Sequence, residues 1–216
     1  MFDTASQRAA MVASQLRPND VTDARIRDAM LTIPRERFVP APVAPVAYAE
    51  DCIPLGNGRV LADPRAFAKL LQLAAVGPND SVLDVGCGTG YSSAVLSLLA
   101  NRVVALEEDA ALAAEAEKNL QTLGPNVRLV HGGLTAGWPQ EGPYDVIFVH
   151  GAVEVEPSVL LSQLKDGGRL TVIWRQGAAG QARLYVNHAG AIGERSDFNA
   201  LLPVLPGFEK PSAFVF

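Results

Sequence analysis

Apolar residues recur at helical spacing in the first part of the chain. One apolar stripe covers residues 4–16, and a second begins near Thr22, a suitable N-cap, and closes at Pro34. A proline-rich stretch over residues 38–47 then favours an extended connection. The N-terminal part is therefore expected to consist of two helices followed by irregular chain.

A third helix is predicted after a short turn. Residues 53–58 contain two glycines and an asparagine and are expected to form a tight loop. Asp63 and Pro64 have the types preferred at the N-cap and the first position of a helix, which should run to about residue 75. Asp63 is interpreted as a cap because its charge would repel an anionic substrate.

Beyond residue 80 the pattern becomes a regular alternation of short apolar runs and helical stripes. The expected strands cover residues 81–85, 102–106, 127–130, 144–149 and 168–174, and the expected helices residues 90–100, 110–123 and 157–164. Such alternation is typical of a parallel sheet with helices on both faces. Two further strands, over residues 182–186 and 212–216, are expected to form an antiparallel edge.

Composition agrees with a single globular α/β domain. The chain has 216 residues, 49% apolar and 19% charged, with a net charge of −5 and no cluster of basic residues, so nucleic acid is not an expected partner. Residues 1–8 lack the apolar core of a signal peptide, and the run 94–100 is too short to cross a membrane. Two cysteines without a CxxC pair fit a reducing compartment. A cytoplasmic protein is therefore expected.

The main chemical signal is a glycine-rich turn between the first predicted parallel strand and its helix. Gly86, Gly88 and Gly90 let the backbone bend sharply and approach a ligand, and the sixth position, Tyr91, departs from the dinucleotide pattern Gly-x-Gly-x-x-Gly. The residues predicted to bind a cofactor here are Asp84, Gly86, Cys87, Gly88, Thr89 and Gly90. Cys87 is interpreted as a small filler of the loop rather than as a nucleophile.

An acidic residue, Glu107, ends the next predicted strand. A carboxylate at this place can accept hydrogen bonds from both hydroxyls of a ribose. The alternative is a solvated charge at the start of the following helix. Together with the glycine turn, Glu107 favours a nucleoside-containing cofactor.

These motifs are similar to the first motif of the S-adenosylmethionine methyltransferases, and residues from about 7 to 175 resemble the protein-L-isoaspartate O-methyltransferases, of which the chain is identified as a divergent member. The matching segments are residues 11–16, 33–40, 47–48, 54–58, 63–64, 83–94, 126–127, 137–138, 143–145, 163–164 and 167–168. Residues 33–40, Ile-Pro-Arg-Glu-Arg-Phe-Val-Pro, are close to the family signature Val-Pro-Arg-x-x-Phe-Val-Pro.

The resemblance implies a Rossmann-like methyltransferase fold, with a mostly parallel sheet of about seven strands, an antiparallel C-terminal edge and extra N-terminal helices. Residues 1–62 would form a helical and substrate-loop segment, and residues 63–216 the core. It also implies S-adenosylmethionine as cofactor and the α-carboxylate of isoaspartyl residues in damaged peptides or proteins as methyl acceptor. The oligomeric state stays open.

Two positions depart from the family pattern. The acceptor loop reads Val60-Leu61-Ala62 instead of Thr-Ile-Ser, and the turn after the third strand reads Gly132-Gly133-Leu134 instead of Gly-Asp-Gly, whose Asp contacts the adenine. Each lost hydrogen bond to a charged or buried partner costs about 1.5–3 kcal/mol. An altered acceptor and a non-catalytic relative therefore stand as alternatives to isoaspartyl repair.

Three side chains or positions are candidates for the acceptor site: Arg59, Ala62 and His150. Arg59 stands where the family has Gln and could grip a carboxylate bidentately, or it could be a solvated loop residue. His150 follows the predicted strand 144–149 and could act as a base for a hydroxyl or amine acceptor, or it could be structural.

Overall fold

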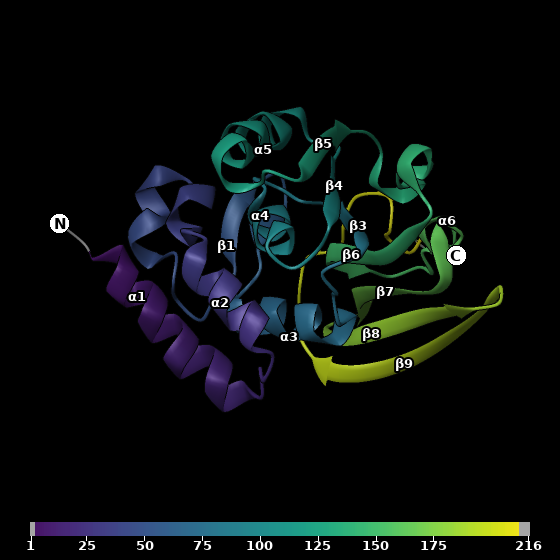
Figure 1. The fold of residues 1–216 in the computed structure, drawn as a ribbon, viewed down its shortest axis with the longest axis horizontal. Helices are drawn as coiled ribbons and strands as arrows, with labels where there is room; N and C mark the ends of the chain where they lie inside the picture. Colours follow the sequence, from purple (N-terminus) through teal and green to yellow (C-terminus); the bar gives the residue numbers. More distant parts are fainter. Residues whose placement is uncertain (1–2, 212–216) are drawn as a thin grey trace, which may run out of the picture.

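The computed structural model describes residues 3–211 and contains a central sheet of seven strands (Figure 1). In order across the sheet they are β5 (Val127–His131), β4 (Arg102–Glu107), β3 (Ser81–Val85), β6 (Tyr144–Val153), β7 (Leu164–Gln176), β8 (Ala179–His188) and β9 (Ala191–Asn199). The strands from β5 to β7 are parallel, whereas β8 and β9 are antiparallel. The predicted fold class is confirmed.

Helices cover both faces of this sheet. The helices are α1 (Thr4–Met11), α2 (Ala24–Thr32), α3 (Pro64–Ala74), α4 (Tyr91–Ser97), α5 (Ala110–Leu123) and α6 (Ser158–Leu161). Neighbouring strand residues point to opposite faces, so Val82 and Phe148 share one apolar core with α1 to α5. Leu83 and Ile147 belong to the other core, which α6 and the chain after β9 complete.

Several local predictions need correction. The loop at residues 53–58 is part of a hairpin of β1 (Ile53–Gly56) and β2 (Arg59–Leu61), whose turn uses the positive φ of Gly56 and Asn57. The connection at residues 38–47 contains the 3₁₀ turn Ala41–Val46 rather than extended chain. The expected strand at residues 212–216 lies outside the described residues.

The caps of the early helices are partly as predicted. The N-cap of α2 is Asp23 rather than Thr22, since its carboxylate accepts the N–H of Arg25 at 2.9 Å. The first helical stripe begins as α1 and continues as the π-helical turn Val12–Leu16. Asp63 caps α3 as expected, accepting the N–H of Ala66 at 2.8 Å.

The N-terminal segment is tied to the core by buried hydrogen bonds. The guanidinium of Arg35 is fully buried and donates to the carbonyls of Ala47 at 2.7 Å and Ala62 at 2.5 Å. The hydroxyl of Thr89, in the glycine turn, donates to the carbonyl of Phe38 at 2.6 Å. This segment therefore forms one wall beside the glycine turn.

After β9 the chain returns to the carboxyl end of β6, as the yellow trace in Figure 1 shows. Val204 forms a parallel bridge with Ala152. The N–H of Ala152 donates to the carbonyl of Pro203, and the carbonyl of Ala152 accepts the N–H of Leu205, each at 2.9 Å. A third bond joins the N–H of Glu154 to the carbonyl of Phe208. We call residues 203–208 the C-terminal strap.

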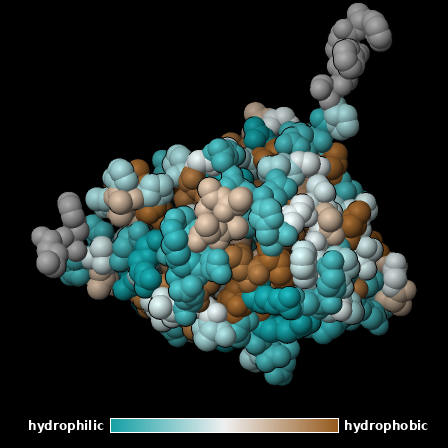
Figure 2. All heavy atoms as spheres, turned by 90° about the horizontal axis from the view of Figure 1, so that it is seen from above, coloured by the Kyte–Doolittle hydropathy of each residue, from teal (hydrophilic) through white to brown (hydrophobic). Residues whose placement is uncertain are grey.

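The surface seen in Figure 2 is mostly polar, with apolar side chains gathered near the middle of that face. Within residues 3–211, no helix has the length and apolar character needed to cross a membrane.

Candidate cofactor site

The glycine turn has the shape that the sequence predicts. It leads from β3 into α4, and Gly86, Gly88 and Gly90 all have positive φ, between 59° and 96°. Such angles strain any residue with a Cβ, so the turn requires glycine. The N–H of Gly86 donates to the carbonyl of Leu106 at 2.9 Å, which fixes the turn to the end of β4.

Glu107 lies directly beside this turn and is fully buried. Its carboxylate accepts the N–H of Gly88 at 2.7 Å, of Glu108 at 3.0 Å and of Asp109 at 3.1 Å. Burial rules out the interpretation of Glu107 as a solvated charge. The sequence thus placed the acidic residue and the glycine turn correctly at one end of the sheet.

Arg59 is the fourth partner of this carboxylate. Its Nη1 lies 2.7 Å from Oε1 of Glu107, and its Nη2 donates to the carbonyl of Gly86 at 2.8 Å. Only 6% of Arg59 is exposed, so the alternative of a solvated loop residue is wrong. In this conformation the guanidinium is committed to Glu107 and Gly86.

The space next to Gly86 is filled by the chain itself. A Cβ built on Gly86 would lie 2.9 Å from Nη2 of Arg59 and 3.2 Å from Cδ1 of Leu205 in the C-terminal strap. On β6, a Cβ on Gly151 would lie 2.5 Å from Leu205. The donor and acceptor types suit an adenosyl group, but this arrangement leaves no room for one against Gly86.

Asp84 faces the helix rather than the outer side of the turn. Its Oδ2 accepts the hydroxyls of Ser92 and Ser93, each at 2.6 Å, whereas Oδ1 has no partner among the described residues. Burial raises the pKa of Asp84 to about 7, although the two hydroxyls act in the opposite direction. Asp84 is thus built into the support of the turn.

Cys87 is buried in the turn, and burial raises the pKa of its thiol well above the ordinary value. A thiol that stays protonated is a poor nucleophile. This environment supports the interpretation of Cys87 as a filler.

The two residues predicted to lie next to the adenine, Gly133 and Leu134, differ in their surroundings. A Cβ on Gly133 would meet nothing within 4 Å, whereas Leu134 is buried and its N–H donates to Oε2 of Glu108 at 3.2 Å. Sequence reasoning missed Glu108, although it directly follows Glu107. A hollow of about 410 Å³ opens here, lined by Asn57, Arg59, Glu108, Asp109 and Pro206.

Two of the three predicted acceptor positions, Ala62 and His150, are buried like the residues of the glycine turn. Ala62 is 1% exposed and His150 is 5% exposed, with the His150 ring 5.7 Å from that of Phe67 and 6.3 Å from that of Phe148. Burial, with the nearby charges of Arg59 and Arg35, lowers the pKa of His150 to about 3. The imidazole is therefore neutral at pH 7, and its role as a base stays a prediction.

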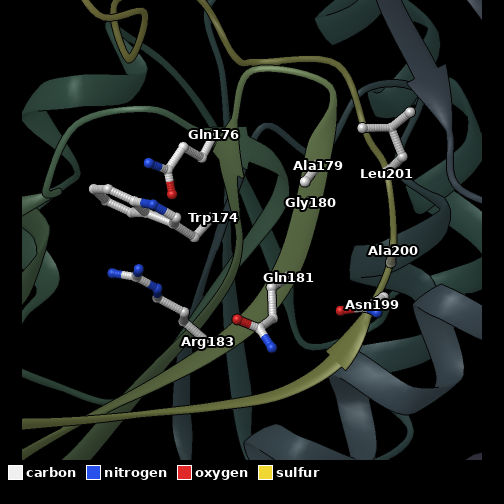
Figure 3. A pocket seen from close by; sticks show the side chains of 9 residues that line it. All are labelled: Trp174, Gln176, Ala179, Gly180, Gln181, Arg183, Asn199, Ala200 and Leu201. Atoms are coloured by element: carbon white, nitrogen blue, oxygen red, sulfur yellow. The ribbon is translucent and has the colours of Figure 1, made fainter.

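A separate hollow of about 470 Å³ lies beside β7 and β8, away from these residues (Figure 3). The guanidinium of Arg183 stacks on the indole of Trp174 at 4.0 Å, and Asn199 to Leu201 form the opposite side. None of the residues predicted for cofactor or acceptor lines it.

Comparison with known proteins shows which family the chain resembles. The profile of the protein-L-isoaspartate(D-aspartate) O-methyltransferases matches residues 6–194. Protein-L-isoaspartate O-methyltransferases of Methylorubrum populi and Koribacter versatilis are each 41% identical over 169 residues, which is 78% of this chain and 80% or 76% of theirs.

Solved structures of similar proteins agree with this family. One protein-L-isoaspartate O-methyltransferase superposes with a TM-score of 0.79 at 27% identity, covering 93% of this chain and 66% of that one. A putative Plasmodium falciparum relative in complex with S-adenosyl-L-homocysteine shares the fold, with a TM-score of 0.81 at 18% identity over 92% of this chain and 97% of its own. The chain belongs to the protein-L-isoaspartate(D-aspartate) O-methyltransferase family of S-adenosylmethionine-dependent protein carboxyl methyltransferases.

Proposed function

We propose that this chain transfers a methyl group from S-adenosylmethionine to the α-carboxylate of isoaspartyl residues in peptides and proteins. The observation that carries the proposal is the glycine turn after β3 with Glu107 at the end of β4, in a chain that matches this family over residues 6–194. In open α/β sheets, ligands bind at the carboxyl ends of the strands, where these residues lie.

The proposed methyl transfer needs no acid or base group from the protein. A carboxylate is ionised at neutral pH and needs no general base to become a nucleophile. S-adenosylmethionine, when bound, supplies an electrophilic methyl group. The task left to the chain is to hold the two reactants in line and to exclude water.

We assign the cofactor side to the glycine turn and Glu107, with Gly133 and Leu134 next to the base. The acceptor side is assigned to Arg59, Ala62 and His150. Burial of His150 beside two aromatic rings shields this position from water, which supports its assignment to a reaction that excludes water. A carboxylate acceptor is compatible with a neutral His150, because no proton has to be removed from it.

The test is methyl transfer from labelled S-adenosylmethionine to an isoaspartyl peptide, with the aspartyl peptide of the same sequence as control. We expect methylation of the isoaspartyl peptide alone. Glu107→Gln should abolish it, whereas Glu115→Gln, at an exposed position of α5, should leave it unchanged.

A folded protein that binds the cofactor but ignores the isoaspartyl peptide would refute the assigned acceptor. Transfer to a hydroxyl or amine acceptor that is lost in His150→Ala would then establish the alternative of a changed acceptor.

A further inference from the structure

Three of the residues assigned to the cofactor, Gly86, Glu107 and Leu134, are engaged by the chain itself. Arg59 neutralises Glu107, Leu205 covers Gly86, and the carboxylate of Glu108 takes the N–H of Leu134. The groups that make these three contacts come from β2, from the C-terminal strap and from the residue that follows β4. They converge on the carboxyl ends of β3 and β4, which we assigned to the cofactor.

The contact of Leu205 is a close one. Glycines at 86 and 151 flank its side chain, and a Cβ at either place would come within 3.3 Å of Leu205. Glycine beside a site commonly lets a ligand approach the backbone. Here the group that uses this space is a leucine that is only 2% exposed.

The C-terminal strap that carries Leu205 is bound to a single strand edge. Three backbone hydrogen bonds join it to Ala152 in β6 and to Glu154 directly after this strand, and Leu205 and Phe208 anchor it in the apolar core of that face. Such a segment can leave without breaking the pairing of β6 with β3 or β7.

The ion pair between Arg59 and Glu107 is a second contact that competes with the cofactor. Both oxygens of Glu107 already accept hydrogen bonds, one from Arg59 and two neighbouring N–H groups and the other from Gly88. Because Oε1 already accepts three hydrogen bonds, a ribose diol could bind both oxygens of this carboxylate only by replacing the guanidinium at Oε1. An apolar side chain and a cation therefore oppose the same ligand at adjacent points.

From this arrangement we infer that the chain is self-inhibited: Leu205 of the C-terminal strap and Arg59 occupy the part of the S-adenosyl site against Gly86 and Glu107. The cofactor then binds only when Leu205 leaves Gly86 and Arg59 releases Glu107. The inference rests on the proposed function, because it takes the glycine turn and Glu107 as the cofactor site. A closed state that outweighs the open state tenfold weakens the observed affinity by about that factor.

The first test is calorimetric titration of S-adenosylhomocysteine into the full chain and into the double variant Arg59→Gln with Leu205→Ala. The matched control is Arg195→Gln with Leu201→Ala, which makes the same two changes at exposed positions. We expect the first variant to bind about tenfold more tightly or better, and the control to bind like the unmodified chain.

A second measurement needs no substitution. Hydrogen exchange of the amides of Ala152, Glu154 and Leu205 should become faster when the unmodified chain is saturated with S-adenosylhomocysteine, because these amides hold the strap in place. Micromolar binding with unchanged or slower exchange would overturn the inference and leave the proposed function standing. Absence of binding to both the unmodified chain and a folded double variant would overturn both.

Discussion

Replacing Arg59 with alanine tests whether the buried ion pair exists in solution. The change leaves Glu107, which is fully buried, without its cation, and removal of one partner of a buried pair costs about 3–5 kcal/mol of unfolding free energy. Three backbone N–H groups still contact the carboxylate. We therefore expect a loss near the lower figure of this range.

The measurement is urea unfolding followed by circular dichroism, with Lys118→Ala as the control. The pair of Lys118 and Glu115 on α5 has the same N···O distance of 2.7 Å, but its side chains are 68% and 57% exposed. Exposed pairs of this kind contribute about 0.3–0.5 kcal/mol. Equal losses in the two variants would show that Arg59 is solvated and that the closed arrangement is not populated.

The remaining predictions concern pH and capping. The raised pKa of Asp84 stabilises the folded state below pH 3.8, and this stabilisation is lost as the pH rises toward 7. The lowered pKa of His150 has the opposite effect: it stabilises the folded state above pH 6.5, and this stabilisation is lost as the pH falls toward 3. We therefore compare the unfolding free energy of each variant with that of the unmodified chain between pH 4 and 6.5. This difference should rise with pH for Asp84→Asn and fall with pH for His150→Phe, by up to about 1.4 kcal/mol per pH unit. Urea unfolding at three pH values measures these slopes, and parallel slopes in all three chains would contradict the two shifts. Asp63→Ala should cost about 1 kcal/mol by removing the N-cap of α3, and Asp63→Ser should keep most of it; an equal loss in both would point to another role for the carboxylate.

The parallel core was predictable because its strands are short, apolar and separated by helical stripes. Strand β9 was not, since residues 191–199 are almost entirely exposed and carry no alternation of burial. This strand exists through its backbone pairing with β8, which the sequence pattern does not record.

The candidate site was predictable where its residues are local in sequence. The glycine turn and Glu107 each follow an apolar strand, so their positions at one end of the sheet followed from the fold class. The partner of Glu107 is 48 residues away in sequence, on a hairpin that reads as a loop. Leu205 belongs to a segment without helical or strand periodicity, so the sequence pattern did not predict its position. Leu202, Leu205 and Phe208 are all buried, so the apolar residues of this segment indicated that it packs against the core.

The hydrogen bond between Thr89 and Phe38 has a consequence for synthesis on the ribosome. Its two residues are 51 positions apart, so at about 5–20 residues per second Phe38 waits several seconds for the glycine turn to be made. During that interval Arg35 also lacks the carbonyl of Ala62, 27 positions later. Until α3 and α4 emerge, α2 can pack only against α1 and the turn Val12–Leu16, so the N-terminal segment completes its packing late in synthesis.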